Sequence, residues 1–462
     1  MTIFERLFNR QSKAKSQRML EATSGKRWTN TPPFGSMAAE VAGGASRVRG
    51  RARHIRHNEP LAANAASIYR TSLVGHGVTA ASQHTDAGAR SRIDEAFAAW
   101  AEKTRFAELQ AEIADAIVTD GEAIIVMRIG DDGELRLQHI PAEQLDESLT
   151  VELAGGGYIA NGVEFDASDE IVAYHIFRTR LTDIFPSSQT PIRIPAEDVL
   201  HIFKREGAGQ HRGLSWFAPV VLPINELSQL QDALLVSAKI QAMMCGFVQD
   251  VNGNGTAFAD GQQSGSTMDL SLEPGTMRVL PSGYSVTFSN PAQMQQSVDF
   301  ASHSIRMIAA GLQIPEFLLS GDMRNVNYSS ARTALVQFRQ HLEAIQFTLL
   351  VPKLFGPIYR RWLALANLTG SLDTGDETGV EWFFPAMPWI DPKKDADGTA
   401  AMIGAGLMSR RQAVAALGFN VEKLDAEIAA DRRRESTHGL SFEQSPTPAA
   451  TQEVKHNAEN DD

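Results

Sequence analysis

The chain has 462 residues, enough for two or three domains, and its 43 % apolar and 21 % charged content excludes a wholly disordered protein. Its longest apolar runs, at 96–101, 123–127 and 217–224, are far shorter than the roughly 18–20 residues of a membrane-spanning helix. The single cysteine, Cys245, excludes intrachain disulfides and a cysteine-based zinc cluster within one chain. The first residues lack an apolar signal segment, so we expect neither secretion nor a membrane partner, and a reducing cytoplasm fits.

Charge is unevenly distributed along the chain. The net charge is −12, but residues 1–56 hold 12 Lys/Arg against Glu5, Glu21 and Glu40, so the rest of the chain is strongly acidic. The basic N-terminal segment could bind phosphate groups or an acidic partner, whereas the acidic remainder of the chain would repel a nucleic acid backbone. The alternative is a solvated arm on an acidic domain. In either case the composition predicts disorder over 1–46 and a mobile segment over 1–56.

Helices come first and strands later in the first half of the chain. Apolar residues at three- and four-residue steps predict helices over 46–75 and 92–119. The period then changes, and 123–129 and 134–140 read as strands around a GDDG turn, with further strands at 171–177 and 199–203. The pattern predicts an α+β domain over 47–222.

A long helix, an excursion and a returning helix follow. A helix is expected over 223–246, then a Gly/Ser-rich loop at 251–270, short strands near 277–280 and 285–288, and a second helix over 291–314 that Asn290 and Pro291 begin. The apolar stripes of the two helices contain Ile224, Leu227, Leu230, Leu234, Val298, Ile305, Ile308 and Leu312.

The remaining chain is mainly helical. A polar loop at 315–328 precedes a long helix that begins near Ser329 and that Pro352 must break or kink. Asp391-Pro392 and Ser409 are expected to begin two more helices, and the last helix covers 421–434. From Glu435 onward the composition predicts disorder.

Catalytic motifs are absent from the sequence. Residues 24–27 (SGKR) fail the phosphate-loop pattern, and neither G-x-G-x-x-G after a strand nor G-x-S-x-G occurs. His54 and His57 could share a metal, and Asp120 and Glu122 could be nuclease-like ligands. The alternative for His54 and His57 is a solvated basic helix face. The alternative for Asp120 and Glu122 is that they are ordinary acidic residues at a helix-to-strand turn. The acidic run 373–377 lacks the closing glutamate of a calcium loop. We therefore expect no catalytic residue, cofactor or metal ion.

Six segments of the sequence are distinctive. In chain order they are RARHIRHNEP (51–60), VGHGV (74–78), GQHRGLSWFAP (209–219), IAAGL (308–312) with Ile314-Pro315, SGD (320–322) and NYSSAR (327–332). These segments resemble the lambda family of phage portal proteins, and the most specific string is N-Y-S-S-x-R. The resemblance covers roughly residues 46–435. One departure is HNEP at 57–60, where the family more often has paired asparagines.

The resemblance implies a structural protein rather than an enzyme. It implies a ring of about twelve identical subunits at one capsid vertex, around a channel that double-stranded DNA crosses in packaging and ejection. Implied parts are a wing (47–222), stem helices (223–246 and 291–314), a clip (247–290), a channel loop (315–328), a long kinked helix with a return to the wing (329–389) and a crown (390–434). Implied partners are the large terminase subunit, a head–tail adaptor, and the major capsid and scaffold proteins. The implied location of the protein is the virion and, during assembly, the host cytoplasm.

The resemblance also assigns the candidate site residues. The stem stripes become the oligomer interface, and the loop with its helix start faces DNA. Polar groups there can touch phosphates without reading sequence, whereas an acidic body with few exposed cations lets a duplex slide. The alternative is an ordinary loop in which Ser329 is the N-cap and Arg332 pairs with an acidic neighbour. The assigned loop residues are Arg324, Asn325, Asn327, Tyr328, Ser329, Ser330 and Arg332.

Two rival functions remain open from the sequence. One is a metal-dependent nuclease or protease of packaging, which would use Asp120, Glu122 or the histidines. The other is a head–tail adaptor without its own DNA channel. Native mass separates a large ring from a small enzyme oligomer, and electron microscopy separates a portal from an adaptor.

Overall fold

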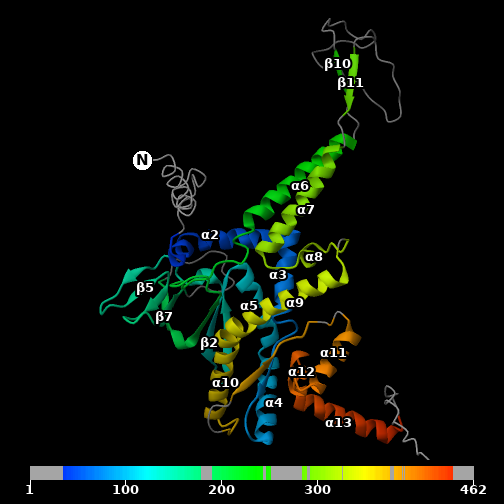
Figure 1. Cartoon of the computed structure of the whole chain (residues 1–462). Helices are drawn as coiled ribbons and strands as arrows, with labels where there is room; N and C mark the ends of the chain where they lie inside the picture. The colour runs from blue at the N-terminus through cyan, green and yellow to red at the C-terminus, as the bar shows by residue number, and fades with distance from the viewer. Residues whose placement is uncertain are drawn as a thin grey trace, which may run out of the picture. The chain divides into compact units, whose positions relative to one another are not determined.

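A computed structural model describes residues 35–177, 190–242, 246–250, 284–288, 292–324, 326–374, 379–387, 389 and 391–440 (Figure 1). The chain forms two compact units. The first combines the chain up to Gly77 with Ala99–Glu377, and the second combines Val78–Ala98 with the chain from Thr378. Among the described residues, none of the helices has the length and apolar character needed to cross a membrane.

Two helices open the first unit. Ser36 caps α2 (Met37–Asn58), and Pro60 occupies the first position of α3 (Pro60–Leu73), where its missing N–H costs nothing. The prediction of a disordered or mobile arm is wrong from Met37 onward, because Arg49 and Ile55 of α2 are buried. Arg49, Arg53 and Arg56 of α2 are therefore part of the packed fold, through ion pairs with Glu122, Asp120 and Asp115. Residues 1–34 lie outside the described residues.

The helix predicted over 92–119 is two helices. α4 (Ala87–Lys103) ends before Arg105, and α5 (Phe106–Thr119) begins directly after it. Arg105 has a φ of 51°, a left-handed conformation that breaks helical geometry. A continuous apolar period does not reveal such a turn when the residue that makes it is not glycine.

Two further antiparallel sheets lie in the first unit. The smaller has the order β3-β2-β9, with β2 at Glu122–Ile129, β3 at Leu135–Ile140 and β9 at Val199–Phe203, so the strands predicted there are confirmed. The larger has the order β4-β5-β6-β7-β8 and confirms the strand predicted at 171–177. Ile124 and Val126 of β2 pack into a core with residues of the larger sheet such as Val163. The larger sheet consists of Val151–Glu152, Tyr158–Ala160, Val163–Phe165, Ile171–Ile176 and Ile192–Pro195, and short helical turns lie at Ala142–Gln144 and Ala196–Asp198.

A helix pair ends in a two-stranded sheet (Figure 1). α6 (Val221–Ala242) packs along α7 (Ala292–Gly311), and β10 (Gly246–Asp250) pairs antiparallel with β11 (Tyr284–Phe288). The predicted helices over 223–246 and 291–314 and the strand at 285–288 are thus present, with shifted ends. The loop at 251–270, the strand near 277–280 and the Asn290-Pro291 helix start lie outside the described residues.

The segment that follows is more helical than predicted. The predicted loop over 315–328 contains a short helix, α8 (Glu316–Ser320), before α9 (Tyr328–Ile345) begins. Pro352 does not break the helix after α9. A π-helical stretch, Gln346–Phe355, accommodates it and leads directly into α10 (Gly356–Leu368). Wider π turns remove the clash that proline makes in a regular α-helix.

In its described residues, the second unit holds a strand pair, most of α4 and three further helices. β1 (Thr79–Ser82) pairs antiparallel with β12 (Val380–Phe383). Asp391 and Ser409 cap α11 (Pro392–Gly404) and α12 (Arg410–Ala416), as predicted. α13 (Val421–His438) continues one turn beyond the predicted end, so disorder from Glu435 is wrong as far as His438. The segment 441–462 is outside the described residues.

Candidate channel loop and oligomer surface

Helix α3 holds the chain just before the predicted loop (315–328) and the first part of that loop. The side-chain amide of Asn64 donates to the carbonyl oxygens of Leu318 and Leu319, each at 2.9 Å. The hydroxyl of Tyr69, which is buried, donates to the carbonyl of Leu312. α8 ends at Gly321, whose φ of 72° favours glycine. The part of the segment that α3 does not hold is therefore the short stretch between Gly321 and the start of α9.

Arg324 lies at the tip of this stretch, paired with Asp322. Its Nη2 is 2.7 Å from Oδ2 of Asp322, its Nε is 2.9 Å from Oδ1, and its backbone N–H donates to Oδ1 at 3.0 Å. The Arg324 side chain is 83 % exposed. Its hydrogen bonds lower the pKa of Asp322 to about 2, so the carboxylate is charged at neutral pH. The predicted DNA-facing arginine is thus engaged within its own loop.

A capping box begins α9 at Asn327. The Asn327 side chain accepts from the backbone N–H of Ser330 at 2.8 Å, and Ser330 Oγ accepts from the backbone N–H of Asn327 at 3.2 Å. The alternative that placed the N-cap at Ser329 is therefore wrong. Arg332 donates to the hydroxyl of Tyr328 at 3.4 Å. Asn325 lies outside the described residues.

Burial along the predicted stem stripes decreases from one end to the other. Ile224, Leu227, Ile308 and Leu312 are buried inside the subunit. Leu230, Leu234 and Ile305 are half-buried, and Val298 is 58 % exposed. Further large apolar side chains are exposed on α6, α7 and the long helix; these are Leu222, Leu235, Val236, Phe300, Met307, Tyr328, Val336 and Phe347. A stripe pattern alone did not separate the side chains that the subunit buries from those that it exposes.

The carboxylates considered as metal ligands are held by arginines. Asp120 accepts from Nε and Nη2 of Arg53, each at 2.7 Å. Glu122 is 1 % exposed and accepts from Arg212 and from the backbone N–H of Gly213 at 2.8 Å. Among the described residues, no group of three or more His, Cys, Asp or Glu side chains could hold a metal ion. His54 lies beside Asn58, with 3.3 Å between Nδ1 and the amide nitrogen.

Glu122 is the centre of a buried charge cluster that the sequence did not reveal. Arg49 of α2 lies 3.3 Å from its Oε1, and His201 Nε2 of β9 lies 2.9 Å from its Oε2. Arg49 and Arg212 also pair with Glu147. Burial alone would raise the pKa of Glu122, but the charge of Arg212 and the hydrogen bond from His201 hold it below its ordinary value. The cluster ties α2, the small sheet and the 209–219 segment together.

Close backbone packing explains two glycines beside this cluster. A Cβ on Gly213 would lie 2.3 Å from the carbonyl oxygen of Gly121, and one on Gly121 would lie 2.2 Å from the carbonyl carbon of Leu214. Gly121 also has a φ of 91°. The GQHRGLSWFAP string therefore contains residues needed for packing and charge pairing, Arg212 and Gly213 among them.

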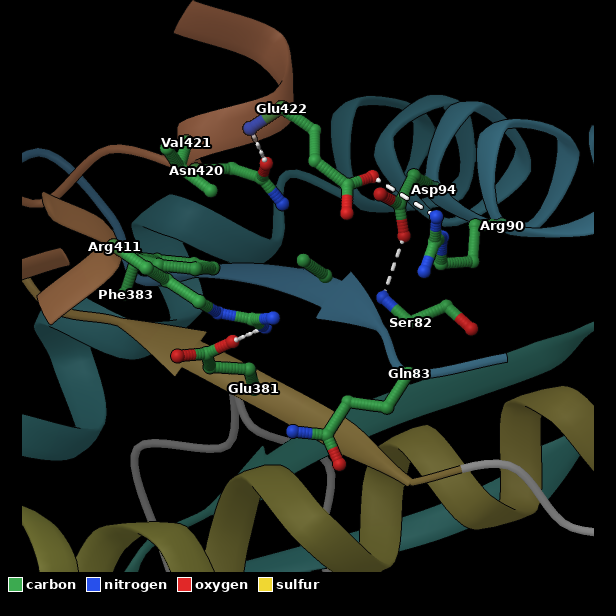
Figure 2. Close-up of a pocket in the computed structure, with 11 residues that line it drawn as sticks. Ser82, Gln83, Arg90, Asp94, Glu381, Phe383, Arg411, Asn420, Val421 and Glu422 are labelled. Carbon is green, nitrogen blue, oxygen red and sulfur yellow. Dashed lines mark hydrogen bonds and ion pairs between the residues drawn. The ribbon is translucent and has the colours of Figure 1, made fainter. Parts of the chain in front are cut away.

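The second unit has a polar pocket of about 180 Å³ (Figure 2). Two ion pairs cross it, Arg90–Glu422 at 3.3 Å and Arg411–Glu381. Asp94 accepts from the backbone N–H of Ser82 at 2.7 Å. These interactions connect α4, the strand pair, α12 and the start of α13, so the pocket's charged groups serve to hold the unit together.

Comparison with known proteins gives a family. Residues 23–346 match the family described as phage portal protein, lambda family. A probable portal protein of Halomonas phage phiHAP-1 is 25 % identical over 444 residues, covering 89 % of this chain and 85 % of the relative. Because the family match spans well over half of the chain, the protein belongs to the lambda family of phage portal proteins. The resemblance found in the sequence and the prediction of a structural, non-enzymatic protein are thereby confirmed, and the α+β class agrees with the structure.

Solved structures show more distant likeness. The neck of an empty gene transfer agent particle, computed with C6 symmetry, aligns with a TM-score of 0.46 and 16 % identity, over 87 % of this chain and 98 % of that one. An HK97 family phage portal protein from Corynebacterium diphtheriae aligns with a TM-score of 0.30 and 12 % identity, over 63 % and 85 %. Likeness at these levels carries no conclusion of its own.

Proposed function

We propose that this portal protein forms a ring of about twelve subunits at one capsid vertex, around a channel that double-stranded DNA crosses during packaging and ejection. The observation that carries the proposal is membership of the lambda portal family over residues 23–346. In the ring, α2 would begin the wing and α6 and α7 would form the stem, with the clip, channel loop, long helix and crown following in the order expected from the sequence. The ring would sit in the virion, after assembly in the host cytoplasm, and would dock the large terminase subunit, a head–tail adaptor, and the major capsid and scaffold proteins.

Exposed apolar side chains on the stem support assembly. Phe300 and Met307 of α7 are each 60 % exposed, and Val236 of α6 is 54 % exposed. Large apolar side chains that a subunit leaves this exposed favour a contact with another protein. α6 and α7 already pack on each other, so further cover has to come from neighbouring copies. The proposed oligomer surface therefore consists of the exposed stem residues.

The channel loop proposal rests on a polar segment whose two ends are held by hydrogen bonds. Asn64 and Tyr69 of α3 hold the chain before Gly321, and the Asn327 capping box fixes the chain after it. Polar groups presented in this way can touch a phosphate backbone without reading its sequence. Tyr328, Ser329 and Arg332 are exposed on the first turns of α9 and would face the channel with Arg324.

The assembly state tests the proposal directly. Purified full-length protein is imaged by electron microscopy and its native mass is measured. We expect closed rings with a mass of roughly a dozen times 50.4 kDa. Monomers or small oligomers under all conditions would refute the ring. A closed ring through which no duplex passes, judged by nuclease protection, would instead favour an adaptor without a channel.

Reversing the loop charge tests the channel assignment. In Arg324→Glu, like charges would surround the DNA path and repel phosphates, while the exposed side chain leaves the fold unaffected. We expect normal rings and reduced DNA packaging or retention. Unchanged packaging would place the DNA-facing segment elsewhere, with residues 251–270 the next candidate.

A further inference from the structure

At the tip of the proposed channel loop, the Arg324 guanidinium is already paired with the Asp322 carboxylate. Arg324 meets the carboxylate of Asp322 with two nitrogen atoms, Nε at 2.9 Å and Nη2 at 2.7 Å, each on a different oxygen. This is the paired geometry with which a guanidinium also grips a phosphate. A phosphate would therefore compete with Asp322 for the same face of the arginine.

Asp322 is positioned for this competition by the backbone. Its Oδ1 accepts from the Arg324 N–H at 3.0 Å, and its own N–H donates to Ser320 Oγ at 3.0 Å. The turn therefore presents the carboxylate to Arg324 before any DNA arrives. Arg306 of α7 adds positive charge nearby, which further favours a charged Asp322.

The pair is exposed, so it can open. The Arg324 side chain is 83 % exposed, and exposed ion pairs are weak because water and salt screen them. A phosphate can displace the carboxylate briefly, and the carboxylate can recapture the guanidinium when the phosphate moves away. An unpaired arginine would have no such return partner and would hold the phosphate longer.

We propose that Asp322 is an internal competitor for DNA phosphate, which keeps Arg324 from holding DNA as the duplex moves past the loop. This inference rests on the proposed function, because it requires the loop to face DNA. In a ring the effect is repeated in every subunit. The Asp322–Arg324 pair then contributes no net charge to the DNA path, although each subunit presents an arginine.

The test measures DNA binding by full-length rings with a 30-base-pair duplex over 50–200 mM KCl. The variant is Asp322→Asn, whose amide oxygen can still accept the backbone bond and preserve the turn. We expect several-fold tighter binding at 50 mM. The slope of log affinity against log salt steepens by about 0.9 for each arginine that reaches a phosphate. In Asp322→Asn/Arg324→Gln the slope returns to the wild-type value.

A second exposed pair provides the matched control. Asp425 and Arg410 of the second unit form a bidentate pair at 2.9 and 2.6 Å, and both side chains are about half exposed. Asp425→Asn makes the same charge change and frees an arginine that is not part of the loop. An equal gain in this control means a general charge effect and overturns the inference.

Two further outcomes separate the inference from the proposed function. If wild-type rings form and protect a threaded duplex from nuclease, but Asp322→Asn leaves the salt slope unchanged, the inference fails and the channel stands. If no variant forms rings or protects DNA, the proposed function fails and the inference falls with it.

Discussion

Two arginine–carboxylate groups in the first unit use the same chemistry in opposite surroundings. Glu122 is 1 % exposed and is surrounded by Arg49, Arg212 and His201, whereas Asp322 holds Arg324 on a largely solvent-exposed loop. In the first group, removing one partner leaves buried charge that water does not reach and that the remaining partners compensate less well. In the second, water replaces whatever is removed. The buried group therefore specifies the fold, and the exposed one is free to exchange partners.

The largest effect is expected from breaking the buried group. Glu122→Gln leaves Arg49 and Arg212 buried with less compensation, which costs about 3–5 kcal/mol of folding stability. The matched control is Glu134→Gln, whose partner Lys103 is exposed, and it should leave the unfolding midpoint unchanged. The measurement is urea unfolding followed by circular dichroism. Equal midpoints for both variants would show that burial does not separate these charge pairs.

The same contrast applies to apolar residues of α7. Ile308 is 0 % exposed, so Ile308→Ala should cost about 2–5 kcal/mol through lost contacts and a cavity. Phe300 is 60 % exposed, so Phe300→Asp should unfold at the wild-type urea concentration yet give smaller assemblies in analytical ultracentrifugation. Intact rings in Phe300→Asp would remove Phe300 from the proposed oligomer surface.

Acid should weaken the buried group in two stages. Burial lowers the pKa of His201 below its ordinary 6.5, so stability is full above that pH and falls below it, as the unfolded chain takes up the proton first. The pKa of Glu122 is lowered as well, so a second loss begins below about 4.5. Urea midpoints at pH 7.5, 5.5 and 4 should decrease in that order. His201→Gln should flatten the first step, and a midpoint that increases with acid would contradict both assignments.

The smallest effect is expected at the start of α9. Asn327→Ala removes the cap and should cost about 0.5–2 kcal/mol of local helix stability. Hydrogen exchange of the first turn should become faster, while Ser329→Ala, one residue beyond Tyr328 and without a capping bond, should not change it. Equal exchange in the two variants would return the N-cap to the position considered from the sequence.

The sequence predicted helices and strands better than it predicted which side chains pair. Periodicity located α6, α7, β2 and β3 because apolar spacing reports which face is covered. It missed the break at Arg105 because a left-handed turn at arginine has no compositional signal. Pro352 was expected to break or kink the helix, and there a π-helical stretch, Gln346–Phe355, replaces regular α-helix without ending the helical run.

Site predictions from the sequence were limited by long-range pairing. Glu122 was a candidate metal ligand, yet its partners Arg49 and Arg212 lie 73 and 90 residues away along the chain. Nothing in local spacing joins such residues. The reverse holds at the loop tip, where Asp322 stands only two residues from Arg324, but composition does not show which of the nearby groups an exposed arginine pairs with.

The way in which α3 holds the loop has a mechanical consequence. Asn64 and Tyr69 grip backbone carbonyls before the loop, and Gln346 beyond α9 donates to the carbonyls of Ser72 and Leu73 at the end of the same helix. Helix α3 therefore anchors the chain both before Gly321 and after α9. A force applied to Arg324 would be divided between these two sets of hydrogen bonds, so the tip could bend while the chain on either side keeps its position on α3.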